Sequence, residues 1–165
     1  MPGPVSVDHN SYPDSYIREI LRNVRSIAMV GASATWSRPS NFAMKYLLKK
    51  GFKVIPVNPG AVGQKICGET VFPDLSSLSG TLDMVDIFRP AEDAPKLVEE
   101  AIKIGAKVFW MQLEIRHAEA AKRAEEAGLQ VVMDRCPKIE YTRLTGELGW
   151  NGINTGVISN RRKRL

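Results

Sequence analysis

Short apolar runs alternate with amphipathic stretches along this chain. The apolar runs are 26–31, 52–57, 84–88, 107–111 and 129–133. Such runs are typical of strands buried on both faces of a parallel sheet. The amphipathic stretches, with apolar residues three and four positions apart, are 14–23, 39–50, 94–102 and 117–127, and a shorter one covers 138–144. This spacing predicts helices.

The regular alternation of strands and helices predicts an α/β fold. We expect a Rossmann-like, doubly wound, mainly parallel five-stranded sheet with helices on both faces, in a strand order such as 3-2-1-4-5. Residues 60–80 lack a helical pattern and hold one short extended piece at 69–72. The predicted organisation is one domain over 14–145, a flexible N-terminus over 1–13, and a Gly-rich extension with a basic tail over 146–165.

Composition narrows the class of protein without naming an activity. The 165 residues are 44% hydrophobic and 25% charged, which is ordinary for a globular domain. No run approaches the ~20 apolar residues of a membrane span, and the N-terminus lacks the apolar core of a signal peptide. Two cysteines, Cys67 and Cys136, are too few for a disulfide scaffold. We therefore expect a cytoplasmic protein.

The net charge of +5 comes largely from the C-terminal tail. Arg161, Arg162, Lys163 and Arg164 supply four of these charges, which leaves +1 for the rest of the chain. Because nucleic-acid domains spread basic groups over a face, nucleic-acid binding is unlikely. The tail is interpreted as a solvated terminus. Alternatively, residues 146–165 contact a partner or a second copy, giving a homo-oligomer.

The loop after the first predicted strand, 31–40, carries the clearest functional signal. In open parallel sheets, ligands bind beyond the carboxyl ends of the strands. Here small residues, hydroxyl groups and Arg38 precede a helix N-terminus, which suits an anion such as phosphate. Alternatively, Ser37 or Ser40 simply caps the helix.

Two nucleotide-binding patterns are absent. The dinucleotide pattern G-x-G-x-x-G keeps only Gly31, with Ser33 at the second glycine position, and Asn58 stands where an acidic residue would bind ribose. The nucleoside triphosphate pattern G-x-x-x-x-G-K-[ST] is also missing.

Several short segments together resemble the small stand-alone coenzyme A-binding proteins, whose fold is similar to the N-terminal domain of the succinyl-CoA synthetase α-subunit. The segments are Val30-Gly31-Ala32-Ser33, Arg38-Pro39-Ser40, Val57-Asn58-Pro59, Asp86-Ile87-Phe88-Arg89, Trp110-Met111-Gln112 and Asp134-Arg135-Cys136-Pro137. The resemblance covers about residues 14–145 and implies a Rossmann-like domain that binds coenzyme A. The synthetase has a lysine after its second strand where this chain has Ala61. We expect no second domain that could carry the ligase chemistry of the synthetase.

The binding residues that this resemblance and the loop chemistry indicate all follow strand ends. They are Gly31, Ala32, Ser33, Ala34, Thr35, Trp36, Arg38, Pro39, Ser40, Asn58, Pro59, Phe88, Arg89 and Pro90. Arg38 and Arg89 suit phosphate groups, and Phe88 or Trp36 could pack on adenine. For Arg89 the alternative is a surface ion pair with Glu92 or Asp93.

Other reactive side chains give weaker signals. Trp110 is expected in the core, and Asp83 and Asp86 are expected to be solvated or to cap backbone. Cys136 could face the thiol of the coenzyme, although a buried, inert thiol is the expected state. No pair of residues has the spacing of metal ligands, and no catalytic residue is assigned.

The leading hypothesis is a module that binds coenzyme A or a short acyl-CoA without catalysis of its own. The alternative is an NAD(P)-binding oxidoreductase or a small acyl-CoA enzyme. A hydride-transfer enzyme needs a proton donor, and no Tyr-x-x-x-Lys pair is evident.

Overall fold

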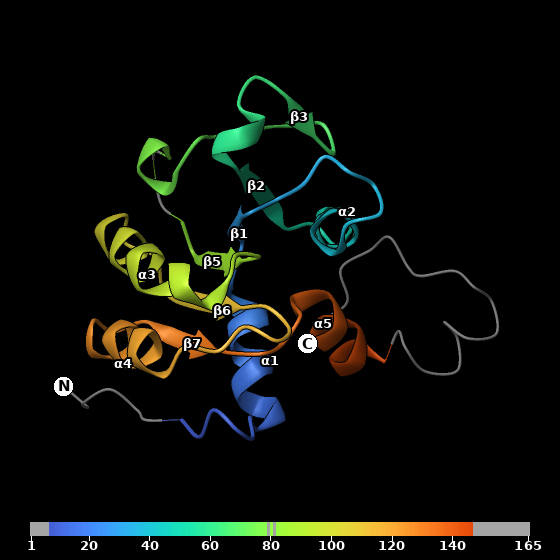
Figure 1. Cartoon of the computed structure of the whole chain (residues 1–165). Coiled ribbons are helices and arrows are strands. Elements are labelled where there is room, and N and C mark those ends of the chain that lie inside the picture. Colours follow the sequence, from blue (N-terminus) through green and yellow to red (C-terminus); the bar gives the residue numbers. More distant parts are fainter. Residues whose placement is uncertain (1–6, 79, 81, 147–165) are drawn as a thin grey trace.

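A parallel five-stranded sheet forms the centre of the molecule (Figure 1). The computed structural model describes residues 7–78, 80 and 82–146 of the chain. The strands of the sheet are β1 (Ser26–Val30), β2 (Lys53–Val57), β5 (Met84–Ile87), β6 (Val108–Met111) and β7 (Gln130–Val132). Every adjacent pair is parallel, so the predicted fold class is confirmed.

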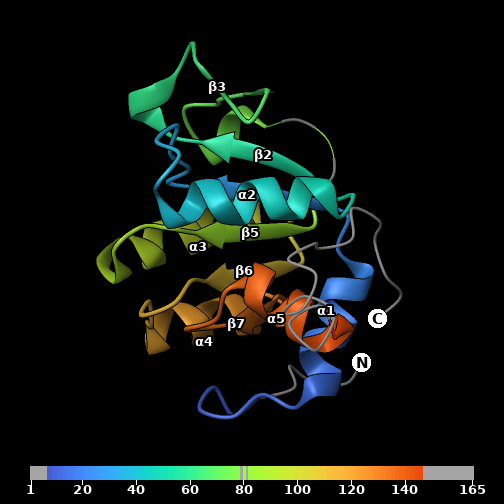
Figure 2. The same cartoon turned by 90° about the vertical axis from the view of Figure 1, so that its right-hand side faces the viewer.

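Helices cover both faces of this sheet, as Figures 1 and 2 show from two sides. They are α1 (Asp14–Asn23), α2 (Pro39–Lys49), α3 (Ala94–Lys103), α4 (Ala118–Glu126) and α5 (Pro137–Thr145). Helices α1, α2 and α5 pack on one face, and α3 and α4 pack on the other. All five were predicted from the sequence to within two residues at each end.

The sheet is buried on both sides, which explains why its strands are continuous apolar runs. In β1, Ile27 and Met29 enter the core beneath α1, α2 and α5, whereas Ala28 and Val30 enter the core beneath α3 and α4. Alternate side chains of a strand point to opposite faces, so a strand between two helical layers needs apolar residues at every position.

The strand order differs from the expected 3-2-1-4-5. The order is β2-β1-β5-β6-β7, which is 2-1-3-4-5 when the five strands are counted along the chain. The third strand along the chain, β5, pairs with β1 rather than with β2. Near its carboxyl end, the outer edge of β2 is bridged by Phe72, whose N–H donates to the Pro56 carbonyl at 3.0 Å and whose carbonyl accepts from the Asn58 N–H at 2.9 Å.

The segment between β2 and β5 carries the chain across β1 without an α-helix. It contains the 3-10 turns η1 (Pro59–Ala61) and η2 (Leu75–Ser77), and the hairpin of β3 (Lys65–Ile66) and β4 (Glu69–Thr70). The extended piece expected at 69–72 corresponds to β4 and the Phe72 bridge to Val57.

Part of the N-terminus, expected to be flexible over 1–13, lies against the edge strand β7. The Tyr12 hydroxyl accepts from the Met133 N–H at 2.8 Å, and the Tyr16 hydroxyl donates to the Val131 carbonyl at 2.8 Å. His9 in turn lies 2.7 Å from the Tyr12 hydroxyl. At the other terminus α5 ends at Gly146, and the rest of the predicted extension, 147–165, lies outside the described residues.

Candidate functional site

The strand order places a topological switch point between β1 and β5. The chain leaves β1 toward α2 on one face of the sheet and leaves β5 toward α3 on the other. Ligands of open α/β sheets bind where neighbouring connections diverge in this way. The carboxyl ends of β1, β5 and β2 are therefore the part of the molecule to analyse.

Gly31 lets the ends of three strands approach each other. Its φ is +87°, and a Cβ atom at this position would lie 2.7 Å from the Phe88 carbonyl oxygen and 3.1 Å from Cδ of Arg89. The Gly31 N–H donates to the Val57 carbonyl at 2.8 Å, and the Phe88 N–H donates to the Val30 carbonyl at 2.8 Å. No residue with a side chain fits this junction without displacing the backbone after β5.

The loop after β1 is held in shape by polar side chains rather than by a helix cap. The Ser33 N–H donates to the Ser40 hydroxyl at 3.0 Å, and the Asn41 amide donates to the Ser33 carbonyl at 2.9 Å. The Asn58 amide donates to the Ala32 carbonyl at 2.9 Å, which ties the loop to the end of β2. Helix α2 begins at Pro39 with no side-chain cap, so the capping interpretation of Ser37 or Ser40 is wrong.

A pocket of about 530 Å³ opens at these strand ends on the α3 face. Its lining residues are Val30, Gly31, Val57, Asn58, Pro59, Pro73, Asp74, Leu75, Arg89, Asp93, Lys96, Leu97 and Glu100. Apolar side chains of β1, β2, η2 and α3 contribute to it, and its charged groups comprise three carboxylates and two cations. Both its place and its size are typical of a site for a small organic ligand.

Four of the predicted site residues line this pocket: Gly31, Asn58, Pro59 and Arg89. The other ten belong to the segments after β1 and β5 and do not line the pocket. Ala34, Thr35, Trp36, Arg38, Pro39 and Pro90 are exposed, Ala32 and Ser40 are buried, and Ser33 and Phe88 are half-buried. Trp36 is 71% exposed on its loop, whereas Trp110 is fully buried in the core, as expected.

Arg89 forms the surface ion pair that was its alternative interpretation. Its Nε lies 3.0 Å from Oδ2 of Asp93, one turn further along the chain. Both side chains are partly exposed, so the pair is weak and its guanidinium can exchange partners. The ion pair and a role in ligand binding are therefore compatible.

A second polar group lies on the opposite face of the sheet. Asp86 of β5 is fully buried, and Nε2 of Gln112 lies 3.3 Å from its Oδ2 atom. Burial raises the pKa of Asp86 well above its usual value. Its Oδ1 atom and Oδ1 of the buried Asn41 have no hydrogen-bond partner among the residues that the structure describes.

Asp83, just before β5, and Asp86, within β5, therefore have different roles. The expectation of a solvated or capping role is wrong for Asp86, because its position on an inward-facing row of β5 buries it. Asp83 does bind backbone, since its Oδ2 accepts from the N–H groups of Arg25 at 2.7 Å and Ser26 at 3.1 Å. Burial opposes ionisation of Asp83, but these hydrogen bonds outweigh it and lower the pKa.

Cys136 belongs to the same face as Asp86 and is the N-cap residue of α5. It is half-buried rather than fully buried, and burial raises the pKa of its thiol although backbone N–H groups of Ile139 and Lys138 oppose this. Asp86 lies close enough for its charge to raise the same pKa further. Sequence reasoning found Cys136 by its place after a strand but could not show that Asp86 is its neighbour.

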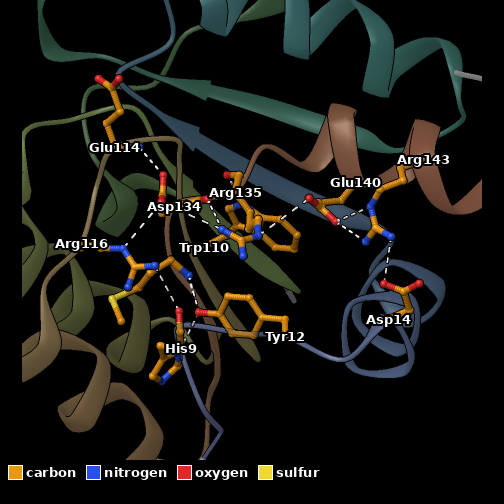
Figure 3. A network of polar contacts seen from close by, with 11 residues as sticks. His9, Tyr12, Asp14, Trp110, Glu114, Arg116, Asp134, Arg135, Glu140 and Arg143 are labelled. Atoms are coloured by element: carbon orange, nitrogen blue, oxygen red, sulfur yellow. Dashed lines mark hydrogen bonds and ion pairs between the residues drawn. The ribbon is translucent and has the colours of Figure 1, made fainter.

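The segment that carries Cys136 is held by a network of polar contacts (Figure 3). Nε1 of Trp110 donates to the Arg135 carbonyl at 2.7 Å, and Oδ1 of Asp134 accepts from the Glu114 N–H at 2.7 Å. The Arg135 guanidinium lies over the Tyr12 ring and 3.9 Å from a carboxylate oxygen of Glu140. Asp134 has a positive φ of 58°, a conformation that such contacts must maintain.

The two histidines of the chain have structural partners. His117 is the N-cap of α4, and its Nδ1 accepts from the Ala120 N–H at 3.0 Å. His9 contacts Tyr12 and Glu125. Within residues 7–146, apart from the two positions that are not described, no group of three side chains could hold a metal ion. Over the same residues, no helix is long and apolar enough to cross a membrane.

A parallel α/β sheet with helices on both faces defines the class of Rossmann-like α/β proteins, and its pocket lies at the switch point where such folds bind ligands. Residues 25–142 match the family model described as the CoA binding domain. The chain belongs to this family, and the resemblance seen in the sequence is confirmed.

Proteins of similar length and larger enzymes both resemble the chain. It is 34% identical over 125 residues to the uncharacterized protein YneT of Bacillus subtilis, covering 76% of this chain and 91% of that one. A solved structure of a hypothetical protein from Pyrococcus horikoshii is 40% identical, with a TM-score of 0.78, and covers 84% of this chain and 96% of that one. The α-subunit of an ADP-forming acetate–CoA ligase of Pyrococcus furiosus is 33% identical over 94 residues, which are 54% of this chain and 20% of that subunit.

Proposed function

We propose that the chain binds coenzyme A or a short acyl-CoA at the carboxyl edge of the sheet, without catalysing a reaction of its own. The observation that carries the proposal is the pocket at the β1/β5 switch point in a member of the CoA binding domain family. Of the predicted site residues, Gly31, Asn58, Pro59 and Arg89 line this pocket and would make the contacts.

The charges around the pocket indicate how the ligand would lie. Apolar side chains such as Val57 and Leu97 suit adenine. The charged side chains of the pocket suit phosphate less well, because carboxylates outnumber cations. Phosphate groups would be repelled from Asp74 and Glu100, so we place them at the rim. There Arg89, the loop after β1 and the N-terminus of α2 can bind them.

The end of β2 bears on the choice between coenzyme A and NAD. Asn58, in place of an acidic residue at the end of β2, removes the usual contact to the ribose of NAD. The cytoplasmic location and the homo-oligomer expected from the sequence stay predictions.

Calorimetric titration with coenzyme A, acetyl-CoA, NAD and NADP tests the proposal. Coenzyme A and acetyl-CoA should bind with similar affinity, and NAD should not bind. Binding of NAD without binding of coenzyme A would overturn the proposal. Turnover of a CoA thioester by the pure protein would instead support the alternative of a small acyl-CoA enzyme.

A pair of arginine variants tests the place of the site. Arg89→Gln should weaken binding of coenzyme A roughly tenfold, because a charge-assisted hydrogen bond to phosphate is lost. Arg123→Gln is the matched control, since Arg123 also forms an exposed ion pair, with Glu99 at 2.7 Å, but does not line the pocket. Equal affinities of the two variants would exclude a phosphate contact by Arg89.

A further inference from the structure

We propose that Lys96 binds the phosphate on the 3′ position of the ribose of coenzyme A, so that the chain distinguishes the coenzyme from its 3′-dephosphorylated form. This inference rests on the proposed function and assigns a specificity-determining residue to the same pocket. Lys96 lies in the first turn of α3, lines the pocket and has an exposed side chain, which places it at the rim.

The first step concerns the charged groups of the pocket, several of which already have partners. The Arg89 guanidinium pairs with the Asp93 carboxylate at 3.0 Å. Oδ1 of Asp74 accepts from the hydroxyls of Ser76 at 2.8 Å and Ser77 at 2.6 Å. An incoming anion must therefore compete with Asp93 for Arg89, and it meets in Asp74 a carboxylate that is held in place.

Lys96 differs from Arg89, the other cation that lines the pocket. Within the part of the chain that the structure describes, its ammonium group has no hydrogen bond and no ion pair within 4.0 Å. The hydroxyls of Ser77 and Ser76 hold the pKa of the Asp74 carboxyl below its ordinary value, and the charge of Lys96 adds to this effect. Lys96 therefore weakens the negative field of Asp74 and is still able to bind an anion directly.

The second step concerns which phosphate of the coenzyme meets Lys96. Coenzyme A carries a pyrophosphate on the 5′ side of its ribose and a third phosphate on the 3′ position. In the proposed function, adenine lies against Leu97, and the pyrophosphate lies near Arg89 and the loop after β1. The ribose joins these two parts at the rim. Lys96 and Leu97 both line the pocket from the first turn of α3, so Lys96 is the cation on the adenosine side, where the 3′-phosphate lies.

The end of β2 does not oppose a phosphorylated ribose. A carboxylate there would bind free ribose hydroxyls and would repel a 3′-phosphate. Asn58 is neutral, and its side chain is engaged within the protein: its amide donates to the Ala32 carbonyl at 2.9 Å, and its Oδ1 accepts from the Gly60 N–H at 2.9 Å. The repulsion expected from an acidic residue at β2 is therefore absent, and the attraction comes from α3.

The expected preference is moderate, because Lys96 is exposed. A contact between an ammonium group and a phosphate is a charge-assisted hydrogen bond, which water and salt weaken at a solvated rim. We expect coenzyme A to bind about tenfold more tightly than 3′-dephospho-coenzyme A at low ionic strength, with a smaller difference at high salt.

Calorimetric titration with coenzyme A and with 3′-dephospho-coenzyme A tests the inference. The wild-type protein should show the tenfold preference without the need for a variant. Lys96→Gln should bind coenzyme A about tenfold more weakly and 3′-dephospho-coenzyme A with unchanged affinity, so that the preference disappears. Lys96→Arg should retain the preference, because it retains the charge.

Lys103→Gln is the matched control for long-range electrostatics. Lys103 is exposed in the last turn of the same helix and does not line the pocket. Its substitution changes the net charge by the same amount as Lys96→Gln. Lys103→Gln should therefore keep the wild-type preference for coenzyme A.

The outcomes separate this inference from the proposed function. Equal affinities of the wild-type protein for the two ligands would overturn the inference and leave the proposed function standing. A preference that persists in Lys96→Gln would also overturn it and would assign the 3′-phosphate to another cation, such as Arg38. If neither ligand binds, the proposed function fails and the inference fails with it.

Discussion

Replacing Gly31 by alanine tests whether the close approach of β1 to the backbone after β5 builds the site. The φ of Gly31 is +87°, and the new Cβ would lie 2.7 Å from the Phe88 carbonyl oxygen, well inside contact distance. Gly51 is a matched control, because its φ is +92° and nothing lies within 4 Å of an added Cβ. The two variants share the backbone strain and differ in the clash.

The expected magnitudes follow from these two contributions. The left-handed conformation costs an alanine about 1–2 kcal/mol in either variant. Overpacking against a backbone atom adds roughly 1–3 kcal/mol at Gly31 alone. With a urea dependence of about 1–3 kcal/mol per molar, Gly31→Ala should lower the urea midpoint by roughly 1 M more than Gly51→Ala does.

Urea denaturation and calorimetry with coenzyme A measure the two consequences. Gly31→Ala should also weaken binding several-fold, because the clash displaces Phe88 and Arg89, and Gly51→Ala should leave binding unchanged. Equal losses of stability in the two variants would refute the argument from close approach. A destabilised Gly31→Ala protein with unchanged affinity would show that this junction does not shape the ligand site.

Three further predictions concern pH, the edge strand and the pocket rim. Burial raises the pKa of Asp86 above its usual 3.8, so Asp86 holds a proton in the folded state at pH values where it has lost it in the unfolded state, and stability should fall as the pH rises above about 4. Asp86→Asn should flatten this part of the profile of melting temperature against pH. An unchanged slope would assign the pH dependence to other groups. Tyr16→Phe should lower the free energy of unfolding by about 1–2 kcal/mol, because it removes the hydroxyl that binds the Val131 N–H and carbonyl. Amide hydrogen exchange at Val131 should be faster in this variant. Asp93→Asn should strengthen binding of coenzyme A a few-fold by releasing Arg89, and an unchanged dissociation constant in calorimetry would show that the pair does not compete with the ligand.

Much of the fold followed from local pattern. Buried strands between two helical layers must be apolar at every position, and the helices that cover them must be amphipathic. Continuous apolar runs therefore located the strands, and apolar residues three and four positions apart located the helices. The glycine that ends β1 and the loop that follows it were likewise recognisable. The strand order was not, because it depends on which strand edges meet in the folded sheet, and the pattern within one strand does not specify its neighbours. The residues around Phe72 likewise do not distinguish its bridge to β2 from an ordinary loop.

The candidate site was also predicted only in part from the sequence. The predicted residues Gly31, Asn58 and Arg89 line the pocket, since each follows a strand and all carboxyl ends meet at one edge. Lys96 and Asn41 were missed. Lys96 lines the pocket from the first turn of α3, and the Asn41 amide donates to the Ser33 carbonyl from within α2. Exposed and functional polar residues of a helix look alike in a sequence, because the neighbouring element decides between them.

The sequence by itself determined the class of fold, the positions of its elements, and the edge at which a ligand would bind, because these depend on periodicity and on where each strand ends. Only the tertiary structure decided which strands are neighbours, which face holds the pocket, and that Asp86 is buried beside Cys136. The physical reason is the distance in sequence over which each property is set. Hydrophobic periodicity is a property of one element, whereas the burial and pKa of a side chain depend on residues tens of positions away that packing brings into contact.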